Sequence, residues 1–299
     1  MAIGTRGNRY DWCVQLSRIG VVGGGTMASG IVEACVLADY DVVVRTRSEA
    51  ASRSVKAALE RHLRRRLTRN EIDDERYETA MSGVRYTTDI DDLYDRHLVI
   101  ESVVEDIEVK KHLFSQLDHV LIEGAMIATN TSTLPVMALA ATTKRPELVL
   151  GLHFFNPVGS LRLVEVVRSL VVAPEVLDAG VHFVQTLDKE PVIVNDEAGF
   201  VVNALLFPYL NTAVRLLERG VATKEDIDRA MMLGCNYPMG PLALLDLVGL
   251  DVAVAILERL YEETGDPAML AAPTLRRMRE AGQLGRKAGR GFYDYQSKI

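Results

Sequence analysis

The chain has few cysteines, no long apolar run and no excess of positive charge. Its three cysteines, Cys13, Cys35 and Cys235, are widely scattered and follow neither metal-ligand nor disulfide spacing. We therefore expect no metal site, no disulfide framework and a reducing, cytoplasmic environment. No apolar run reaches the length of a membrane span, and residues 1–17 carry no apolar signal-peptide core, so we expect no membrane partner.

The remaining composition is that of an ordinary globular protein. A net charge of −7 argues against nucleic acid or an anionic membrane as the main partner. The chain contains 48% hydrophobic and 25% charged residues, as is usual for soluble proteins. Its 299 residues are enough for two domains.

The first part of the chain predicts strands that alternate with helices. Residues 18–22 form a short apolar strand that leads into a glycine-rich turn, a helix over 31–38 and a strand over 41–44. This unit calls for a parallel sheet. Residues 49–80 are helical in pattern, and further buried strands are predicted at 97–101, 126–129, 148–154 and 191–194. We expect an N-terminal extension over 1–17 and a doubly wound, Rossmann-type α/β domain over 18–198.

The pattern changes after this domain. An amphipathic helix is predicted over 200–219, and Thr223 is placed to cap the next one. Helical patterns then continue to about residue 281 with no series of strands. We predict a smaller all-helical domain over 199–299.

The glycine-rich turn matches the G-x-G-x-x-G/A fingerprint of dinucleotide-binding proteins. Gly23 would make the tight turn, Gly25 would admit a pyrophosphate, and Ala28 is small enough for helix–strand packing. The helix start would then present its N–H groups to the phosphates. Its place between a strand and a helix favours a dinucleotide site over a merely structural turn.

The end of the second strand bears on the choice of dinucleotide. NAD-binding proteins usually carry an acid there for the ribose 2′-hydroxyl, whereas this chain has Arg45-Thr46-Arg47-Ser48. Hydroxyl and guanidinium groups can bind a 2′-phosphate, so Thr46 and Arg47 favour NADP(H). The alternative is that the arginines are solvated and NAD(H) binds without its usual carboxylate.

Two ionisable residues stand in apolar, strand-like runs on either side of a turn signal. His153 precedes Asn156-Pro157, and Glu165 follows them. A chain that turns there could bring imidazole and carboxylate together, since a buried charge needs a partner. The pair is either a structural ion pair or a proton-transfer device.

Several uncommon motifs occur in a recognisable order along residues 18–295. They are Gly23-Gly24-Gly25-Thr26-Met27, Val103-Val104-Glu105-Asp106, Asn130-Thr131-Ser132-Thr133, Leu152-His153-Phe154-Phe155-Asn156-Pro157, Gly199-Phe200-Val201-Val202-Asn203, Tyr237-Pro238-Met239-Gly240-Pro241 and Gly289-Arg290-Gly291-Phe292-Tyr293. In these motifs the chain resembles the L-3-hydroxyacyl-CoA dehydrogenase family, especially its short 3-hydroxybutyryl-CoA dehydrogenases.

The resemblance implies hydride exchange between a nicotinamide and C3 of a short-chain 3-hydroxyacyl or 3-oxoacyl thioester. His153 and Glu165 occupy the places of the family's catalytic pair, and Ser132 and Asn203 those of its substrate-contacting residues. Histidine can act as base or acid near neutral pH, while a carboxylate fixes its tautomer. The other two would donate hydrogen bonds to the C3 oxygen. The alternatives are a helix cap for Ser132 and a buried structural amide for Asn203.

The family's cofactor-contacting positions also have counterparts. By resemblance they are Thr26, Met27, Glu105, Lys110, Asn130 and Lys287; the alternative for Lys110 is a solvated lysine in a charged helical run. The family further implies that the helical domain closes on the first domain and supplies a homodimer interface. The chain departs from the family at Ala28, where glycine is usual, and at Thr46, where an acid is usual.

One helical segment carries a basic cluster in an otherwise acidic protein. The cluster comprises Arg61, Arg64, Arg65, Arg66 and Arg69. Its members, Arg65 and Arg69 among them, could bind the phosphates of coenzyme A or of a carrier-protein phosphopantetheine. A solvated helix face is the alternative.

The leading hypothesis is an NADP(H)-preferring 3-hydroxybutyryl-CoA dehydrogenase. Two alternatives stay open: a dehydrogenase of a carrier-protein-bound hydroxyacyl group or a sugar acid, and a non-catalytic dinucleotide-binding protein.

Overall fold

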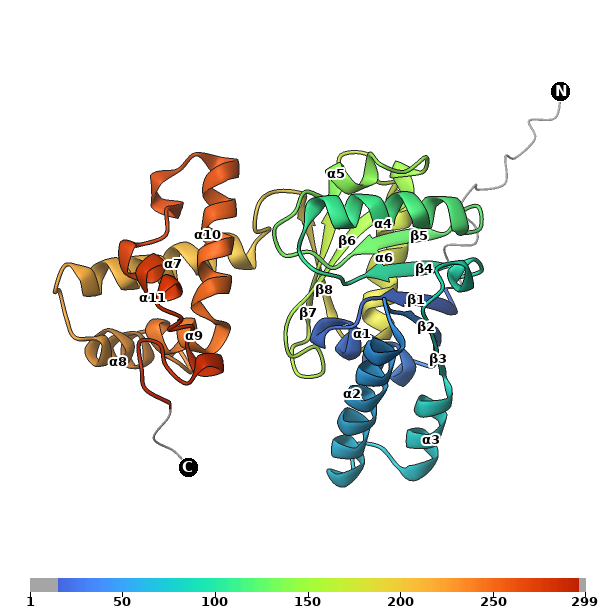
Figure 1. The fold of residues 1–299 in the computed structure, drawn as a ribbon, viewed down its shortest axis with the longest axis horizontal. Helices are drawn as coiled ribbons and strands as arrows, with labels where there is room; N and C mark the ends of the chain where they lie inside the picture. Colours follow the sequence, from blue (N-terminus) through green and yellow to red (C-terminus); the bar gives the residue numbers. More distant parts are fainter. Residues whose placement is uncertain (1–15, 296–299) are drawn as a thin grey trace. The chain divides into compact units, whose positions relative to one another are not determined.

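The structure is a computed structural model that describes residues 16–295, so the predicted extension over 1–17 lies almost wholly outside the described residues. The chain separates into two compact units, one ending at Asp196 and the other beginning at Glu197 (Figure 1). Each unit has its own apolar core.

The first unit is built on one eight-stranded sheet with the strand order β3-β2-β1-β4-β5-β6-β7-β8. Neighbouring strands are parallel except for β6 and β7, which are antiparallel. The strands are β1 (Arg18–Val22), β2 (Asp41–Arg45), β3 (Val84–Thr87), β4 (Leu98–Glu101), β5 (Met126–Thr129), β6 (Val149–Phe154), β7 (Leu163–Arg168) and β8 (Glu190–Asn195).

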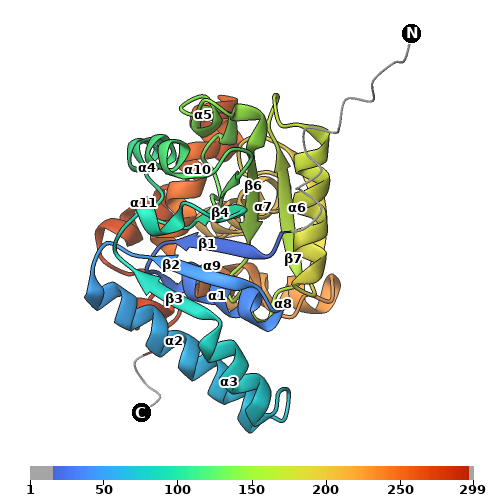
Figure 2. The same cartoon turned by 90° about the vertical axis from the view of Figure 1, so that its right-hand side faces the viewer.

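Helices cover both faces of this sheet (Figure 2). They are α1 (Thr26–Leu37), α2 (Glu49–Thr68), α3 (Asp74–Ser82), α4 (Ile107–Val120), α5 (Val136–Ala140) and α6 (Pro174–Thr186), with short 3-10 turns η2 (Asp91–Leu93) and η3 (Pro146–Leu148). On one face Ile31, Leu59 and Phe183 from α1, α2 and α6 pack on strand residues such as Val21 and Leu152. The expected Rossmann-type α/β domain is confirmed.

Two local features differ from the sequence prediction. β3 was missed, because it is a short edge strand whose residues are only partly buried and therefore show no clear apolar alternation. The helical stretch predicted over 49–80 is two helices, and the chain between α2 and α3 passes through Asn70 in the left-handed region at φ 55°.

The second unit is helical, in agreement with the sequence prediction. Its elements are α7 (Val202–Glu218), α8 (Lys224–Gly234), α9 (Pro241–Val248), α10 (Leu250–Thr264), η4 (Pro267–Met269), α11 (Pro273–Glu280) and η5 (Arg286–Ala288). Leu210, Leu245, Leu257 and Leu275 lie in its core.

A buried carboxylate fastens residues 292–295 to this helical core. Asp246 on α9 is 1% exposed and accepts the backbone N–H groups of Phe292 and Tyr293 at 2.9 and 2.8 Å. The hydroxyl of Tyr295 donates to the same carboxylate at 3.2 Å. Burial raises the pKa of Asp246, while these hydrogen bonds act to lower it. The charged form of the carboxylate is therefore stabilised by its donors.

We expect Asp246→Ala to lower the free energy of unfolding by about 2–4 kcal/mol, because two buried N–H groups lose their acceptor. Glu262→Ala, an exposed change on α10, should alter it by no more than about 0.5 kcal/mol. Urea denaturation followed by circular dichroism compares the two variants. If the two variants have the same free energy of unfolding, the carboxylate of Asp246 does not hold residues 292–295 in place.

Candidate active site

The glycine turn after β1 combines a close backbone contact at Gly23 with open space at Gly25. Gly23 has φ +153°, and a Cβ there would lie 2.2 Å from the carbonyl oxygen of Ser102. A Cβ on Gly25 would meet nothing within 4 Å, so the space above this residue is open. Gly25 is also the N-cap of α1, where no side chain caps the helix and the first turn carries no acid. The free helix N-terminus therefore fits a pyrophosphate.

The strand order places this turn at the switch point of the sheet. β1 lies between β2 and β4, so the chain proceeds to one side of β1 first and then to the other. Dinucleotides bind in the crevice that forms outside the carboxyl ends of the strands at such a point. Thr26 and Met27, the first residues of α1, stand at the same edge.

The end of β2 carries cationic side chains and no carboxylate. Thr46 is 2% exposed, and its hydroxyl donates to the Ser48 carbonyl at 2.9 Å and lies 2.7 Å from the Ser52 hydroxyl. This hydroxyl is therefore engaged within the protein. Arg47 is exposed, while the Nε atom of Arg45 is buried without a hydrogen-bond partner in the described part of the chain.

His153 and Glu165 lie directly opposite each other in the antiparallel pair β6–β7. The Nδ1 atom of His153 is 2.7 Å from Oε2 of Glu165, and the two residues are 6% and 1% exposed. The ring of Phe155 packs on the imidazole with 4.4 Å between centroids. The predicted contact between the two side chains is confirmed, and the sheet register produces it.

Ser132 lies in the turn after β5, where a carboxylate organises the backbone. Oε1 of Glu105 accepts hydrogen bonds from the hydroxyl of Thr131 at 2.5 Å, the backbone N–H of Ser132 at 2.9 Å and the hydroxyl of Ser132 at 3.3 Å. Burial opposes ionisation, but Lys110 and these donors lower the pKa of Glu105. Glu105 is therefore ionised at neutral pH.

Lys110, on α4, is completely buried between two carboxylates. Its Nζ atom lies 2.9 Å from Glu101 and 3.0 Å from Glu105. The sequence did not single out Glu101, the last residue of β4, although an acid closing a buried strand is a signal in itself. Burial raises the pKa of Glu101, while Lys110 and hydrogen bonds from Thr129 and Val103 oppose that rise.

Asn130 connects two strands through its side-chain amide. Its Nδ2 atom donates to the hydroxyl of Ser102 at 3.2 Å, and its Oδ1 atom accepts the backbone N–H of Phe154 at 3.0 Å. Because Phe154 follows His153, this amide brings the Ser132 turn and the His153 strand together at one edge of the sheet.

The remaining predicted residues lie in the second unit. Asn203 is in the first turn of α7. Lys287 is in η5 and donates to Asp251 of α10 at 2.7 Å.

The basic cluster on α2 divides into paired and unpaired arginines. Arg66 contacts Glu33 at 2.6 Å, Arg64 contacts Glu60 at 2.8 Å, and Arg69 lies 3.8 Å from Glu71. Arg61 and Arg65 are exposed.

Neither of these two arginines has an ion-pair partner among residues 16–295. They are the members of the cluster that are available to an anionic ligand.

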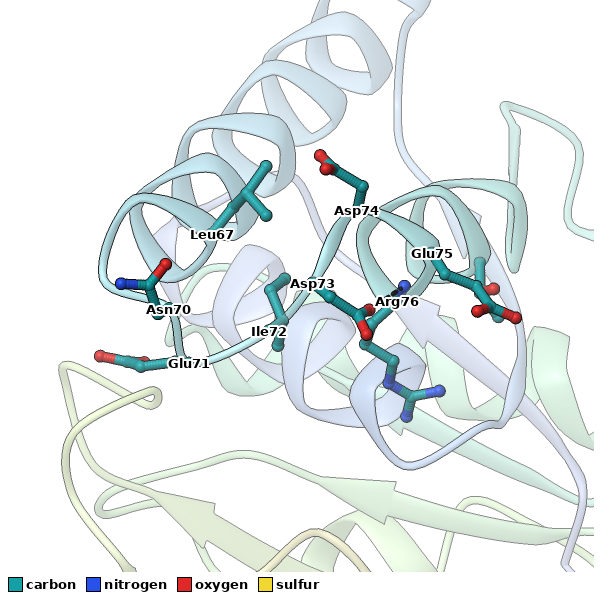
Figure 3. Close-up of a pocket in the computed structure, with 9 residues that line it drawn as sticks. Leu67, Asn70, Glu71, Ile72, Asp73, Asp74, Glu75 and Arg76 are labelled. Atoms are coloured by element: carbon teal, nitrogen blue, oxygen red, sulfur yellow. Dashed lines mark hydrogen bonds between the residues drawn. The ribbon is translucent and has the colours of Figure 1, made fainter.

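A pocket elsewhere on the first unit has the wrong charge for a dinucleotide. It lies between the end of α2 and the start of α3 and includes the carboxylates of Glu71, Asp73, Asp74 and Glu75 (Figure 3). These would repel phosphates. The connection between α2 and α3 also lies toward the amino end of β3, away from the carboxyl edge that carries His153.

Among residues 16–295, no group of three or more His, Cys, Asp and Glu side chains is arranged to hold a metal ion. No helix in that range is both long and apolar enough to cross a membrane.

The chain is similar to known proteins over nearly its whole length. Family models described as 3-hydroxyacyl-CoA dehydrogenase, NAD binding domain, and 3-hydroxyacyl-CoA dehydrogenase, C-terminal domain, match residues 18–197 and 199–295. The 3-hydroxybutyryl-CoA dehydrogenase of Mycobacterium tuberculosis is 46% identical over 282 residues, which cover 94% of this chain and 99% of the relative. The enzyme of the same name from Clostridioides difficile is 44% identical over 278 residues, covering 93% and 99%.

The fold is also similar to that of a solved structure. The (S)-3-hydroxybutyryl-CoA dehydrogenase PaaH1 of Ralstonia eutropha superposes with a TM-score of 0.92 at 38% identity, covering 95% of this chain and 100% of that one. With both domain models matched in order and relatives similar over nearly their whole length, the chain belongs to the 3-hydroxyacyl-CoA dehydrogenase family.

Proposed function

We propose that this protein is a 3-hydroxybutyryl-CoA dehydrogenase. It transfers a hydride between a nicotinamide dinucleotide, NADP(H) by preference, and C3 of a short-chain 3-oxoacyl or 3-hydroxyacyl thioester. The activity named for the relatives from Mycobacterium tuberculosis and Clostridioides difficile supports this substrate class.

The buried His153–Glu165 pair is the observation that carries the proposal. Nδ1 of the ring faces Glu165 at 2.7 Å, so Nε2 is the atom to which we assign proton transfer. In reduction the imidazolium donates its proton to the C3 oxygen, and in oxidation the neutral ring accepts the hydroxyl proton. Glu165 fixes the tautomer and stabilises the charged ring.

Ser132 and Asn203 are the proposed donors to the C3 oxygen. In reduction this oxygen gains negative charge, which hydrogen bonds stabilise most as it develops. Glu105 holds the backbone of Ser132 and so limits the positions of its hydroxyl.

The residues of the glycine turn fit a dinucleotide. Gly23 lets the chain pass close to the carbonyl of Ser102, Gly25 leaves open space, and the first turn of α1 provides N–H donors. When bound, the nicotinamide supplies the hydride for reduction or accepts it in oxidation. Glu105, carried on the loop that follows β4, is assigned to the nicotinamide half of the crevice, with Lys110 acting behind it.

Replacing either member of the pair should abolish most of the turnover. We expect His153→Gln and Glu165→Gln to lower kcat for acetoacetyl-CoA reduction by about 10²–10⁴-fold, the usual contribution of a positioned acid or base. Dinucleotide affinity, measured by fluorescence titration, should be retained. His182→Gln, on the exposed side of α6, is the control and should leave kcat unchanged. Near-normal turnover of purified His153→Gln would refute the assignment.

The preference for NADP(H) depends on the end of β2. The hydroxyl of Thr46 is engaged by Ser48 and Ser52. The available groups are Arg47, which is exposed, and Arg45, whose Nε atom is buried without a hydrogen-bond partner among the described residues. Guanidinium groups can bind phosphate with two hydrogen bonds, and residues 45–48 contain no carboxylate to repel it.

We therefore expect Arg47→Ala to raise the Kd for NADPH by about tenfold, a loss comparable to one charge-assisted hydrogen bond. The Kd for NADH should stay within about twofold, since NADH has no 2′-phosphate. Isothermal titration with both dinucleotides measures the difference, and Arg277→Ala, an exposed arginine on α11, serves as control. Tighter binding of NADH than NADPH by the unaltered protein would overturn the preference.

Arg61 and Arg65 are the proposed contacts for the phosphates of the thioester carrier. Arg69 contributes less, because Glu71 already lies near it. Exposed charges attract a charged ligand without taking part in the chemistry.

The double variant Arg61→Ala/Arg65→Ala should raise KM for acetoacetyl-CoA by about two- to tenfold at unchanged kcat, as expected for exposed ion pairs. Arg64→Ala removes an arginine that is already paired with Glu60 and is the matched control. An unchanged KM would show that this helix face is solvated and does not bind the substrate. If the difference in KM between the double variant and the unaltered protein disappears at high salt, the contact is electrostatic.

We also infer a cytoplasmic homodimer that associates through the helical unit. Large apolar side chains stand exposed on α7 and α8, including Leu205 at 71% and Leu233 at 79%. Exposed apolar residues of this size favour an interface.

A further inference from the structure

A chain of contacts connects the interior of the sheet with the hydroxyl of Ser132. It begins at Glu101, whose Oε2 atom accepts from Thr129 at 2.7 Å and from Lys110 at 2.9 Å. It continues from Lys110 to Glu105 at 3.0 Å and from Glu105 to the N–H and hydroxyl of Ser132. The contacts link strands β4 and β5, helix α4 and the loops that follow the two strands.

Glu101 is the fixed end of this chain. It is 0% exposed, and its two oxygens are held by Thr129 of the adjacent strand and by the backbone N–H of Val103 at 2.6 Å. Its backbone lies in the β4 ladder between β1 and β5. A group held from several sides in this way moves little, so Lys110 takes its position from Glu101.

Glu105 is the more exposed end: its side chain is 35% exposed, and it stands on the loop after β4. A buried ammonium between two carboxylates is stabilised by both. Without the charge of Glu101, Lys110 would be attracted to Glu105 alone and could draw that carboxylate away from the Ser132 turn. The three donors of Thr131 and Ser132 would then lose their common acceptor.

We propose that Glu101 is a positioning residue: through Lys110 it holds Glu105 against the Thr131–Ser132 turn and so sets the position of the Ser132 hydroxyl. The inference rests on the proposed function for the role of that hydroxyl in turnover. The positioning itself can be tested without any substrate.

The test is Glu101→Gln, which keeps the shape and removes the charge. We expect kcat for acetoacetyl-CoA reduction to fall about tenfold to hundredfold, since misplacing a contact group by an ångström costs this much. Asp118→Asn is the matched control, because Asp118 also forms a buried ion pair on α4, with Arg145 at 2.9 Å. Asp118 stands near the other end of α4, so its loss should leave kcat within about twofold. Glu101→Asp should restore part of the rate.

A double-mutant cycle separates positioning from general damage. If Glu101 acts through Ser132, Glu101→Gln should lower kcat little further in a Ser132→Ala background, because the affected group is already absent. The same percentage loss of kcat in both backgrounds, or no loss in either, would overturn the proposal.

Hydrogen exchange gives a readout that needs no turnover. The N–H of Ser132 donates to Glu105, so Glu101→Gln should speed exchange of the peptide that contains it, and Asp118→Asn should not. If Glu101→Gln does not fold, Thr129→Val removes one donor to Glu101 and should give the same change on a smaller scale. Unaltered exchange at Ser132 in a folded variant refutes the positioning. The unaltered protein could instead prove inactive toward acetoacetyl-CoA while Glu101→Gln still speeds exchange at Ser132. That result would count against the proposed function but not against the positioning.

Discussion

The free-energy cost of burying charged groups determines how side chains are arranged at the carboxyl edge of the sheet. His153, Glu165, Glu101 and Lys110 are each no more than 6% exposed there, and an isolated ion so placed would cost several kcal/mol. Each is therefore held against an oppositely charged or hydrogen-bonding partner at 3.0 Å or less. Strands hold His153, Glu165 and Glu101 at fixed backbone positions. The same constraint that stabilises the fold thus fixes the groups to which we assign the chemistry.

The His153–Glu165 pair and the Lys110–Glu105 pair differ in how they are built, and this difference fits their proposed tasks. His153 and Glu165 stand opposite each other on adjacent strands, so their separation depends on the sheet alone. Lys110 comes from a helix, and Glu105 from a loop, so their contact depends on several elements. We regard the first as a rigid proton-transfer unit and the second as the support of a turn that must accommodate a ligand.

The sequence predicted the parts of the fold that local patterns determine. The glycine turn, the apolar strands around it and the helical second part follow from composition and period. The edge strand β3 has no such pattern, and neither the fixed end at Glu101 nor the engagement of Thr46 by Ser52 can be deduced from spacing. Of the arginines on α2, Arg66 is paired with Glu33 of α1, a contact that tertiary packing sets and that spacing along the helix does not show.

The antiparallel register of β6 and β7 also limits how the chain length can vary. In a strand, successive side chains point to opposite faces, so one inserted or deleted residue within β7 before Glu165 would turn its carboxylate to the other side of the sheet. The connection over residues 155–162 carries no such constraint, since the strands pair beyond it. Related chains that retain the pair can therefore differ in the length of this connection. Within β6 and β7 themselves, however, they must keep the spacing that places His153 opposite Glu165.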